Sequence, residues 1–132
     1  MGRRSVIIID DEILIRDLLY DFFTEKEWEV AAFDTGTRAL EALRSRHFDV
    51  ALIDLKLPEE DGLSLIRKVK DLYPAMPIVI MTAYPSVDSA IEAIRLKVDD
   101  YIKKPFNINK LFKALFNLVN EEKSEVAAEV AK

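Results

Sequence analysis

The stretch Val6-Ile7-Ile8-Ile9-Asp10-Asp11-Glu12 gives the first indication of the fold. Its four leading residues are apolar without alternation, which is typical of a central strand that is covered on both faces of a sheet. After the three acidic residues, apolar positions recur at helical spacing, at Ile15, Leu18, Leu19 and Phe22. A buried strand that leads through acidic residues into a helix indicates one βα unit.

The same alternation continues along the chain. Further strands are predicted over residues 28–33, 50–53, 78–81 and 101–102, and a helix is predicted after each. N-caps are expected at Asp34 or Thr35, at Ser86 and at Asn107. The apolar face of the fourth helix is expected to comprise Val87, Ala90, Ile91 and Ile94. This succession predicts an α/β fold, (βα)5, with a five-stranded parallel sheet and helices on both faces.

Composition narrows the classes of function. A chain of 132 residues, 50% hydrophobic and 33% charged, is expected to form one folded domain. It has no cysteine and a single histidine, His47, which excludes a disulfide, a thiolate site and a multi-histidine metal site. The net charge of −5 argues against direct nucleic-acid binding, which needs clustered Lys and Arg. No apolar run is long enough to span a membrane and no signal peptide is visible, so a cytoplasmic location is expected.

Chemically useful side chains stand at the ends of four predicted strands: Asp10-Asp11, Asp54, Thr82 and Lys103-Lys104-Pro105. Parallel strands end at one edge of a sheet, where open α/β proteins bind their ligands, so these groups are expected to converge. Adjacent carboxylates repel one another, and a hard cation such as Mg²⁺ relieves that repulsion with oxygen ligands and water. Beside such a cation, a carboxylate can attack phosphorus, while Lys and Thr stabilise the transferred charge.

Each of these residues also has an ordinary structural explanation. Asp11 could cap the first helix, Thr82 could be a strand residue with a satisfied hydroxyl, and Lys104 could be a solvated charge. Because chemically complementary side chains stand at four strand ends, we do not expect all of these residues to have only a structural role.

Five segments resemble the receiver domain of two-component response regulators: Ile9–Glu12, Leu52–Pro58, Asp61–Gly62, Met81–Ala83 and Asp100–Phe106. They occur in the family's order, and the resemblance covers about residues 4 to 120. It implies the flavodoxin-like fold with strand order 2-1-3-4-5. The rule that open α/β proteins bind ligands at the carboxyl ends of their strands rests in part on receiver structures. The expected fold and the expected position of the site are therefore not independent of each other. The receiver domain is expected over residues 1–120, with 121–132 as a helical C-terminal extension or the start of a linker.

The resemblance implies a role for each site residue. Asp54 is the expected phosphoacceptor, and Mg²⁺, or Mn²⁺ in its place, is expected to bind Asp10, Asp11, Asp54 and the backbone carbonyl of Lys56. The phosphoryl group is expected to contact Thr82, the backbone of Ala83 and Lys104. The Lys104–Pro105 bond is cis in the family. Gly62 is expected to begin the third helix.

The resemblance also implies a switch. Phosphorylation would draw Thr82 and Lys104 toward the site, turn Tyr101 inward, and shift a surface of the fourth helix, fifth strand and fifth helix between two states. The implied partners are a sensor histidine kinase and a downstream effector domain or protein. A homodimer through the C-terminal helix is a further candidate. The chain is expected to be a phosphoacceptor switch that assists its own phosphorylation and dephosphorylation, not an enzyme.

Some positions depart from the family pattern. Lys97-Val98 stands where Gly-Ala is frequent, and Glu27 stands where glycine is frequent, so a side chain must tolerate a left-handed backbone or the loop must differ. Val98 adds bulk near the switch aromatic. Lys56 and Tyr84 border the water that would attack the acyl phosphate, and both are expected to lengthen its lifetime.

Three other interpretations compete. A haloacid dehalogenase-like phosphatase would need a second Asp two residues after Asp10, where this chain has Glu12. A flavodoxin-like cofactor protein would need a Ser/Thr/Gly-rich phosphate loop after the first strand. The third alternative is a phosphorylation-independent receiver-like interaction module. The segments Met81–Pro85 and Lys104–Phe106 are similar to receivers of ATPase-type transcription activators.

Overall fold

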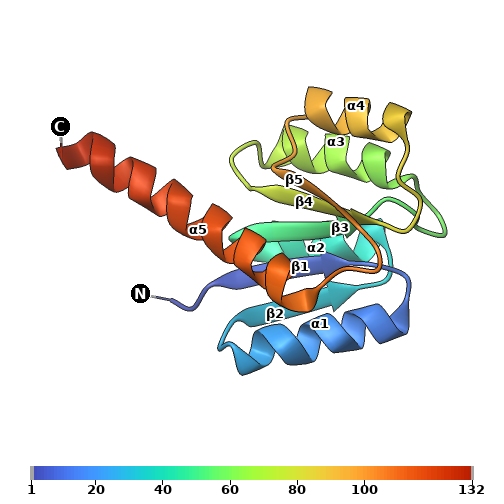
Figure 1. The fold of residues 1–132 in the computed structure, drawn as a ribbon, viewed down its shortest axis with the longest axis horizontal. Helices are drawn as coiled ribbons and strands as arrows, with labels where there is room; N and C mark the ends of the chain where they lie inside the picture. The colour runs from blue at the N-terminus through green and yellow to red at the C-terminus, as the bar shows by residue number, and fades with distance from the viewer. Residues whose placement is uncertain (1, 132) are drawn as a thin grey trace.

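The computed structural model describes the backbone of residues 2–131 and the side chains of residues 2–120. Within this range, strands and helices alternate from β1 to α5 (Figure 1). The strands are β1 (Ser5–Ile9), β2 (Glu29–Phe33), β3 (Val50–Asp54), β4 (Ile78–Thr82) and β5 (Asp100–Lys103). The helices are α1 (Ile13–Glu25), α2 (Gly36–Ser45), α3 (Gly62–Leu72), α4 (Val87–Arg95) and α5 (Ile108–Ala131).

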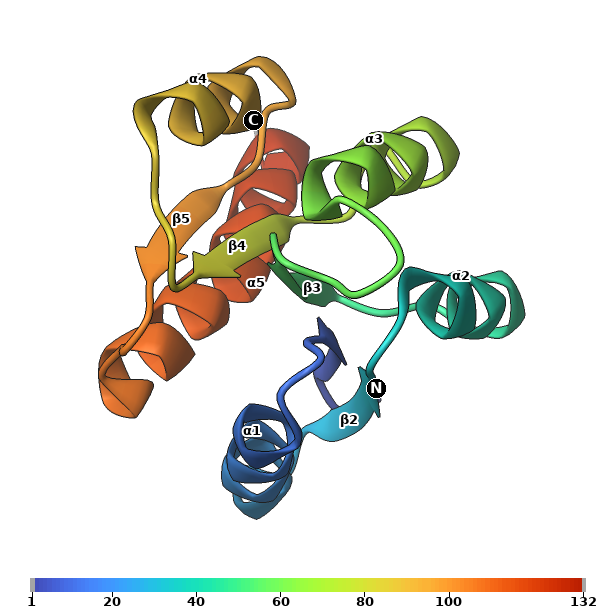
Figure 2. The ribbon, with the colours of Figure 1, turned by 90° about the vertical axis from the view of Figure 1, so that its right-hand side faces the viewer.

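All five strands are parallel and lie in the order β2-β1-β3-β4-β5, which confirms the predicted fold. Helices α1 and α5 cover one face of the sheet, and α2, α3 and α4 cover the other (Figure 2). The sheet therefore lies between two helical layers, as its uninterrupted apolar strands predict.

The core consists of two clusters, one on each face of the sheet. Strand β1 contributes Ile7 and Ile9 to the cluster shared with α2, α3 and α4, and Val6 and Ile8 to the cluster shared with α1 and α5. Every residue of β1, β3 and β4 is buried, since both faces of these strands are covered.

Three helix starts agree with the predicted caps. The side chains of Thr35 and Ser86 accept hydrogen bonds from the third residue of α2 and α4, and Asn107 accepts two at the start of α5. Helix α1 is different, because its N-cap is Glu12 and no side chain caps it. The alternative role of Asp11 as a helix cap is therefore wrong.

The apolar faces predicted for α1 and α4 coincide only in part with the sides of these helices that pack on the sheet. On α4, Val87 and Ile94 are each 75% exposed, and Ala93 is the buried residue of the helix. On α1, Leu18 is 48% exposed, whereas Phe23 is fully buried. Both helices turn an apolar strip toward solvent, so helical periodicity alone did not identify the side that packs on the sheet.

Two residues beyond the ends of α1 and α4, a non-glycine residue adopts the left-handed region. Glu27 has φ of 66° and Lys97 has φ of 60°. The amide after each donates to a carbonyl five residues earlier, from Trp28 to Phe23 and from Val98 to Ala93. This is the Schellman pattern that normally has glycine at the left-handed position, so both departures from the family pattern occupy strained backbone.

Helix α5 continues to Ala131 and projects beyond the sheet (Figure 1). The boundary at residue 120 between a domain and an extension stays a prediction. Among the described residues, no helix combines the length and apolar character needed to cross a membrane.

Candidate functional site

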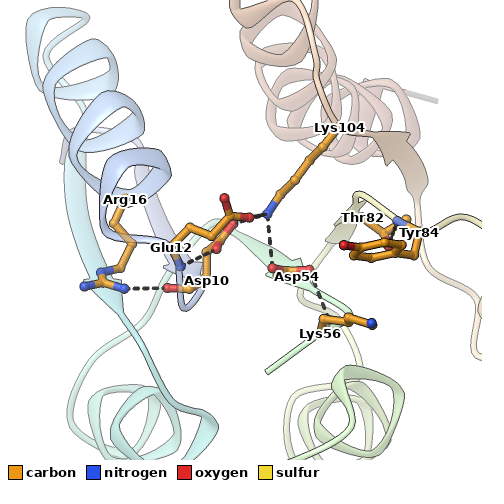
Figure 3. A network of polar contacts seen from close by, with 8 residues as sticks. All are labelled: Asp10, Glu12, Arg16, Asp54, Lys56, Thr82, Tyr84 and Lys104. Atoms are coloured by element: carbon orange, nitrogen blue, oxygen red, sulfur yellow. Dashed lines mark hydrogen bonds and ion pairs between the residues drawn. The ribbon is translucent and has the colours of Figure 1, made fainter. Parts of the chain in front are cut away.

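Side chains at or directly after the ends of β1, β3, β4 and β5 converge at the carboxyl edge of the sheet (Figure 3). Asp10 is fully buried, and Asp54, Thr82 and Lys104 are each less than a tenth exposed. Burial of charged groups is unfavourable unless they are paired, so this arrangement depends on the contacts among them.

Lys104 is the centre of these contacts. Its ammonium nitrogen lies 2.7 Å from Asp10 Oδ2, 2.8 Å from Glu12 Oε1 and 3.1 Å from Asp54 Oδ2. An ammonium has three N–H donors, and here each has a carboxylate oxygen within reach. Among the side chains that the structure describes, Lys104 is the only buried cation, and it joins acids that follow β1, end β3 and precede α1.

Backbone amides fix the two buried carboxylates. The amide of Glu12 donates to Asp10 Oδ1 at 2.8 Å, and the amide of Lys56 donates to Asp54 Oδ1 at 3.0 Å. In both cases the donor lies two residues after the aspartate, and the other carboxylate oxygen faces Lys104. Arg16 of α1 donates to the backbone carbonyl of Asp10 at 2.8 Å.

This environment changes two pKa values. Burial raises the pKa of Asp10 to about 6, because the contact with Lys104 and the hydrogen bond from the Glu12 amide only partly offset the desolvation, and the nearby Asp54 adds repulsion. For Lys104, burial alone would lower the pKa, but the contacts with Asp10, Glu12 and Asp54 outweigh it and raise the pKa above its ordinary value.

The acids fit a hard divalent cation. Carboxylate oxygens of Asp10, Asp11, Glu12 and Asp54 all lie within 4.8 Å of one another. Asp10 Oδ2 is buried and has no hydrogen bond, since Lys104 approaches it only as an ion-pair partner. A buried carboxylate oxygen without a hydrogen bond, beside an exposed Asp11, is the donor set that Mg²⁺ prefers. A hollow of about 380 Å³ opens next to these acids, lined by Asp11, 55–58, Glu60 and Asp61.

On the β4 side, Thr82 engages its own loop. Its hydroxyl accepts a hydrogen bond from the Tyr84 amide at 3.0 Å. The ammonium of Lys56 lies 4.1 Å from the centre of the Tyr84 ring, a cation–π contact between two loops that flank Asp54 (Figure 3). Ala83 lies in the exposed loop between Thr82 and Tyr84.

Tyr101 of β5 is half-buried and attached to the first turn of α4. Its hydroxyl lies 2.7 Å from Ser89 Oγ, and the Ser86 amide donates to it at 3.4 Å. Val98 packs on the same side of the sheet as Tyr101. The Lys104–Pro105 peptide bond, after β5, is cis.

Gly62 allows the loop after β3 to close tightly. A Cβ at this position would lie 2.5 Å from the Cα of Leu55 and 2.6 Å from the Asp54 carbonyl oxygen. Helix α3 begins at Gly62, as expected, and an isolated bridge joins Lys56 to Asp61. The close approach holds the backbone that carries Asp54.

Sequence reasoning missed three residues that contact the site: Glu12, Arg16 and Ser89. Glu12 had a signal, as the third acid after a buried strand, but Lys104 lies 92 residues away and pattern analysis does not pair them. Arg16 and Ser89 lie on helices, and no sequence pattern indicated their contacts. The fold brings Arg16 to the backbone of Asp10 and Ser89 to Tyr101.

The family model described as the response regulator receiver domain matches residues 6–116. The chain belongs to the receiver domain family of response regulators. Receiver domains are phosphoacceptor switches in phosphorelay signalling, not classical enzymes, and response regulators work with histidine kinases and effector domains. Membership in this family argues against the two competing interpretations as a haloacid dehalogenase-like phosphatase and as a flavodoxin-like cofactor protein.

The chain is similar to part of two transcriptional regulators and to a CheY-like receiver domain protein. The transcriptional regulatory protein ZraR of Escherichia coli O157:H7 is 37% identical over 107 residues, which cover 81% of this chain and 24% of ZraR. The DNA-binding transcriptional regulator NtrC of Proteus hauseri is 37% identical over 110 residues, 83% of this chain and 23% of NtrC. A CheY-like receiver domain protein from Methanospirillum hungatei JF-1 has a TM-score of 0.91 at 27% identity, covering 94% of this chain and 99% of that chain. The chain spans about a quarter of the length of these two regulators.

Proposed function

We propose that Asp54 accepts a phosphoryl group from a phosphohistidine on a sensor histidine kinase. The observation that carries the proposal is the buried Asp54 carboxylate, which Lys104 contacts at 3.1 Å beside further acidic residues. A bond forms between a carboxylate oxygen of Asp54 and phosphorus, and the bond from phosphorus to the histidine nitrogen breaks. The Lys56 amide holds the carboxylate in position for that attack.

Mg²⁺, or Mn²⁺ with the same oxygen ligands, fits the acids of this receiver. Asp10, Asp11, Asp54 and the backbone carbonyl of Lys56 would hold it. When bound, the ion supplies electrostatic stabilisation of charge on the transferred phosphoryl oxygens. Lys104 adds a positive charge at the same place, and the Thr82 hydroxyl and the Ala83 backbone amide add hydrogen bonds.

Lys56 and Tyr84 are proposed to lengthen the life of the acyl phosphate. Their cation–π contact bridges two loops on either side of Asp54. A bridge at this place limits the approach of the water that would attack phosphorus, so its loss should speed hydrolysis.

The switching surface is proposed to comprise α4, β5 and α5. Thr82 must leave the Tyr84 amide to reach a phosphoryl group on Asp54, which frees space for Tyr101. Tyr101 is tied to α4 through Ser89, so its movement is passed to that helix. Val87, Ile91 and Ile94 form an exposed apolar strip on α4, which suits a downstream effector or a second copy of the chain.

The relatives suggest the wider setting. ZraR and NtrC are described as transcriptional regulators and are about four times as long as the matched region. We therefore propose that this receiver controls an effector in transcription regulation, in the cytoplasm, with the end of α5 as the start of a linker. The chain itself is not proposed to bind nucleic acid or a membrane.

The test is the intact mass of the protein after incubation with a small phosphoryl donor and Mg²⁺. One phosphoryl group should be added, and Asp54→Asn or chelation of the metal should abolish it. Asp71→Asn, which changes an exposed aspartate on α3, is the matched control and should be labelled like the wild type. A folded wild type that binds Mg²⁺ but gains no phosphoryl group would favour the phosphorylation-independent interaction module.

A further inference from the structure

Carboxylates already surround the ammonium of Lys104. It donates hydrogen bonds to Glu12 and Asp54, and Asp10 Oδ2 lies 2.7 Å away as an ion-pair partner. A phosphoryl group on Asp54 would bring additional oxygens to the same ammonium, so it would compete with these carboxylates for the N–H donors.

Glu12 is the partner that can leave at the smallest cost. Asp10 and Asp54 are buried, and each is also held by a backbone amide. The side chain of Glu12 is 54% exposed, so its carboxylate can be hydrated as soon as it leaves Lys104. Glu12 also stands at the N-cap of α1 without capping it, so Lys104 is the partner of its side chain.

We propose that Glu12 is a positioning residue that holds Lys104 in the unphosphorylated receiver and competes with the phosphoryl group for it. This inference rests on the proposed function of Asp54. In the unphosphorylated state the Glu12 carboxylate forms an ion pair with the Lys104 ammonium beside Asp54. On phosphorylation Lys104 exchanges the Glu12 carboxylate for a phosphoryl oxygen, and Glu12 turns to solvent.

Competition has a defined consequence. Neutralising Glu12 as Glu12→Gln keeps the length of the side chain and removes the charge that attracts Lys104. A phosphoryl analogue should then bind more tightly. Exposed ion pairs are weak, so the expected gain is about two- to fivefold in affinity.

The experiment measures beryllofluoride binding by titration calorimetry at saturating Mg²⁺, for wild type, Glu12→Gln and Glu59→Gln. Glu59→Gln is the matched control, because it removes an equal charge from an exposed residue in the loop after β3. The Mg²⁺ affinity of each protein is measured separately without beryllofluoride. The comparison is repeated with Lys104→Met in each background, where the effect of Glu12→Gln should disappear.

The outcomes separate the two proposals. Tighter beryllofluoride binding by Glu12→Gln, absent in Glu59→Gln and absent without Lys104, supports the competition. Equal gains in both single variants would show a general charge effect and overturn it. Weaker Mg²⁺ and beryllofluoride binding by Glu12→Gln would also overturn it, by making Glu12 a metal ligand. A wild type that binds Mg²⁺ but no beryllofluoride would refute the proposed function itself.

Discussion

Asp10→Asn should stabilise the metal-free protein at high pH. Burial raises the pKa of Asp10 from 3.8 to about 6, so the folded state favours the protonated carboxyl. A tenfold change in proton affinity is worth about 1.4 kcal/mol, so ionised Asp10 lowers the free energy of unfolding by about 3 kcal/mol. Asparagine has nearly the same shape and no charge, and the variant should recover a gain of that order.

The gain in the free energy of unfolding from Asp10→Asn should be larger at high pH than at low pH. A raised folded-state pKa means that the cost of Asp10 is absent below pH 3.8, grows between pH 3.8 and about 6, and is complete above that. Urea unfolding with a chelator present, at pH 8 and at pH 4, measures the free energy of unfolding in each condition. Asp21→Asn, an exposed aspartate on α1, is the control for loss of charge alone.

Mg²⁺ should reverse the order of stability. Only the wild type keeps the full set of proposed carboxylate ligands, and a ligand that binds the folded state adds to stability by mass action. A gain that is the same at pH 4 and pH 8 would assign the effect to packing. A loss at pH 8 would show that the ion pair of Asp10 with Lys104 outweighs the cost of burial, and would refute the reasoning.

Four further outcomes are expected from the site and the loops around it. The affinity for Mg²⁺, measured by calorimetry, should fall as pH is lowered through about 6, because protons compete for Asp10; an unchanged affinity would contradict its role as a ligand. Lys97→Gly should raise the free energy of unfolding by about 1 kcal/mol, since glycine tolerates φ of 60°, whereas Lys103→Gly should not. Gly62→Ala should cost about 2 kcal/mol in urea unfolding, because its methyl group would meet the Leu55 backbone at 2.5 Å. Lys56→Ala combined with Tyr84→Ala should shorten the life of the acyl phosphate, and an unchanged dephosphorylation rate would reject the proposed shield.

The parts of the fold that sequence predicted well are those with local signals. Strands β1, β3 and β4 are continuous apolar runs, which are conspicuous because both faces are buried. Caps such as Ser86 and Asn107 act within their own first helical turn, so the residue type alone locates the helix start.

The parts that sequence missed depend on distant pairing. Glu12 meets Lys104 only because β1 and β5 end at the same edge of the sheet, and no local pattern links the two residues. Leu18 belongs to the apolar stripe of α1, but the helix is rotated so that Leu19 and Phe23 pack inward. Periodicity establishes that a helix is amphipathic, while its rotation is set by the neighbours it meets.

The apolar face of α4 is largely exposed, and this bears on the proposed switch. The helix packs on the sheet through the small side chain of Ala93 and leaves its larger apolar residues, Val87 and Ile94, in solvent. An element with so little buried apolar surface is displaced at low cost. Its ends are held by the Ser89–Tyr101 contact and by a Schellman turn strained at Lys97. A helix that is weakly packed along its length, and attached at its start to Tyr101, the proposed switch residue, is suited to move as a unit when Tyr101 moves. Ser89→Ala should therefore uncouple Tyr101 from α4, so that amide chemical shifts along α4 respond less to beryllofluoride, while the response of β4 is retained.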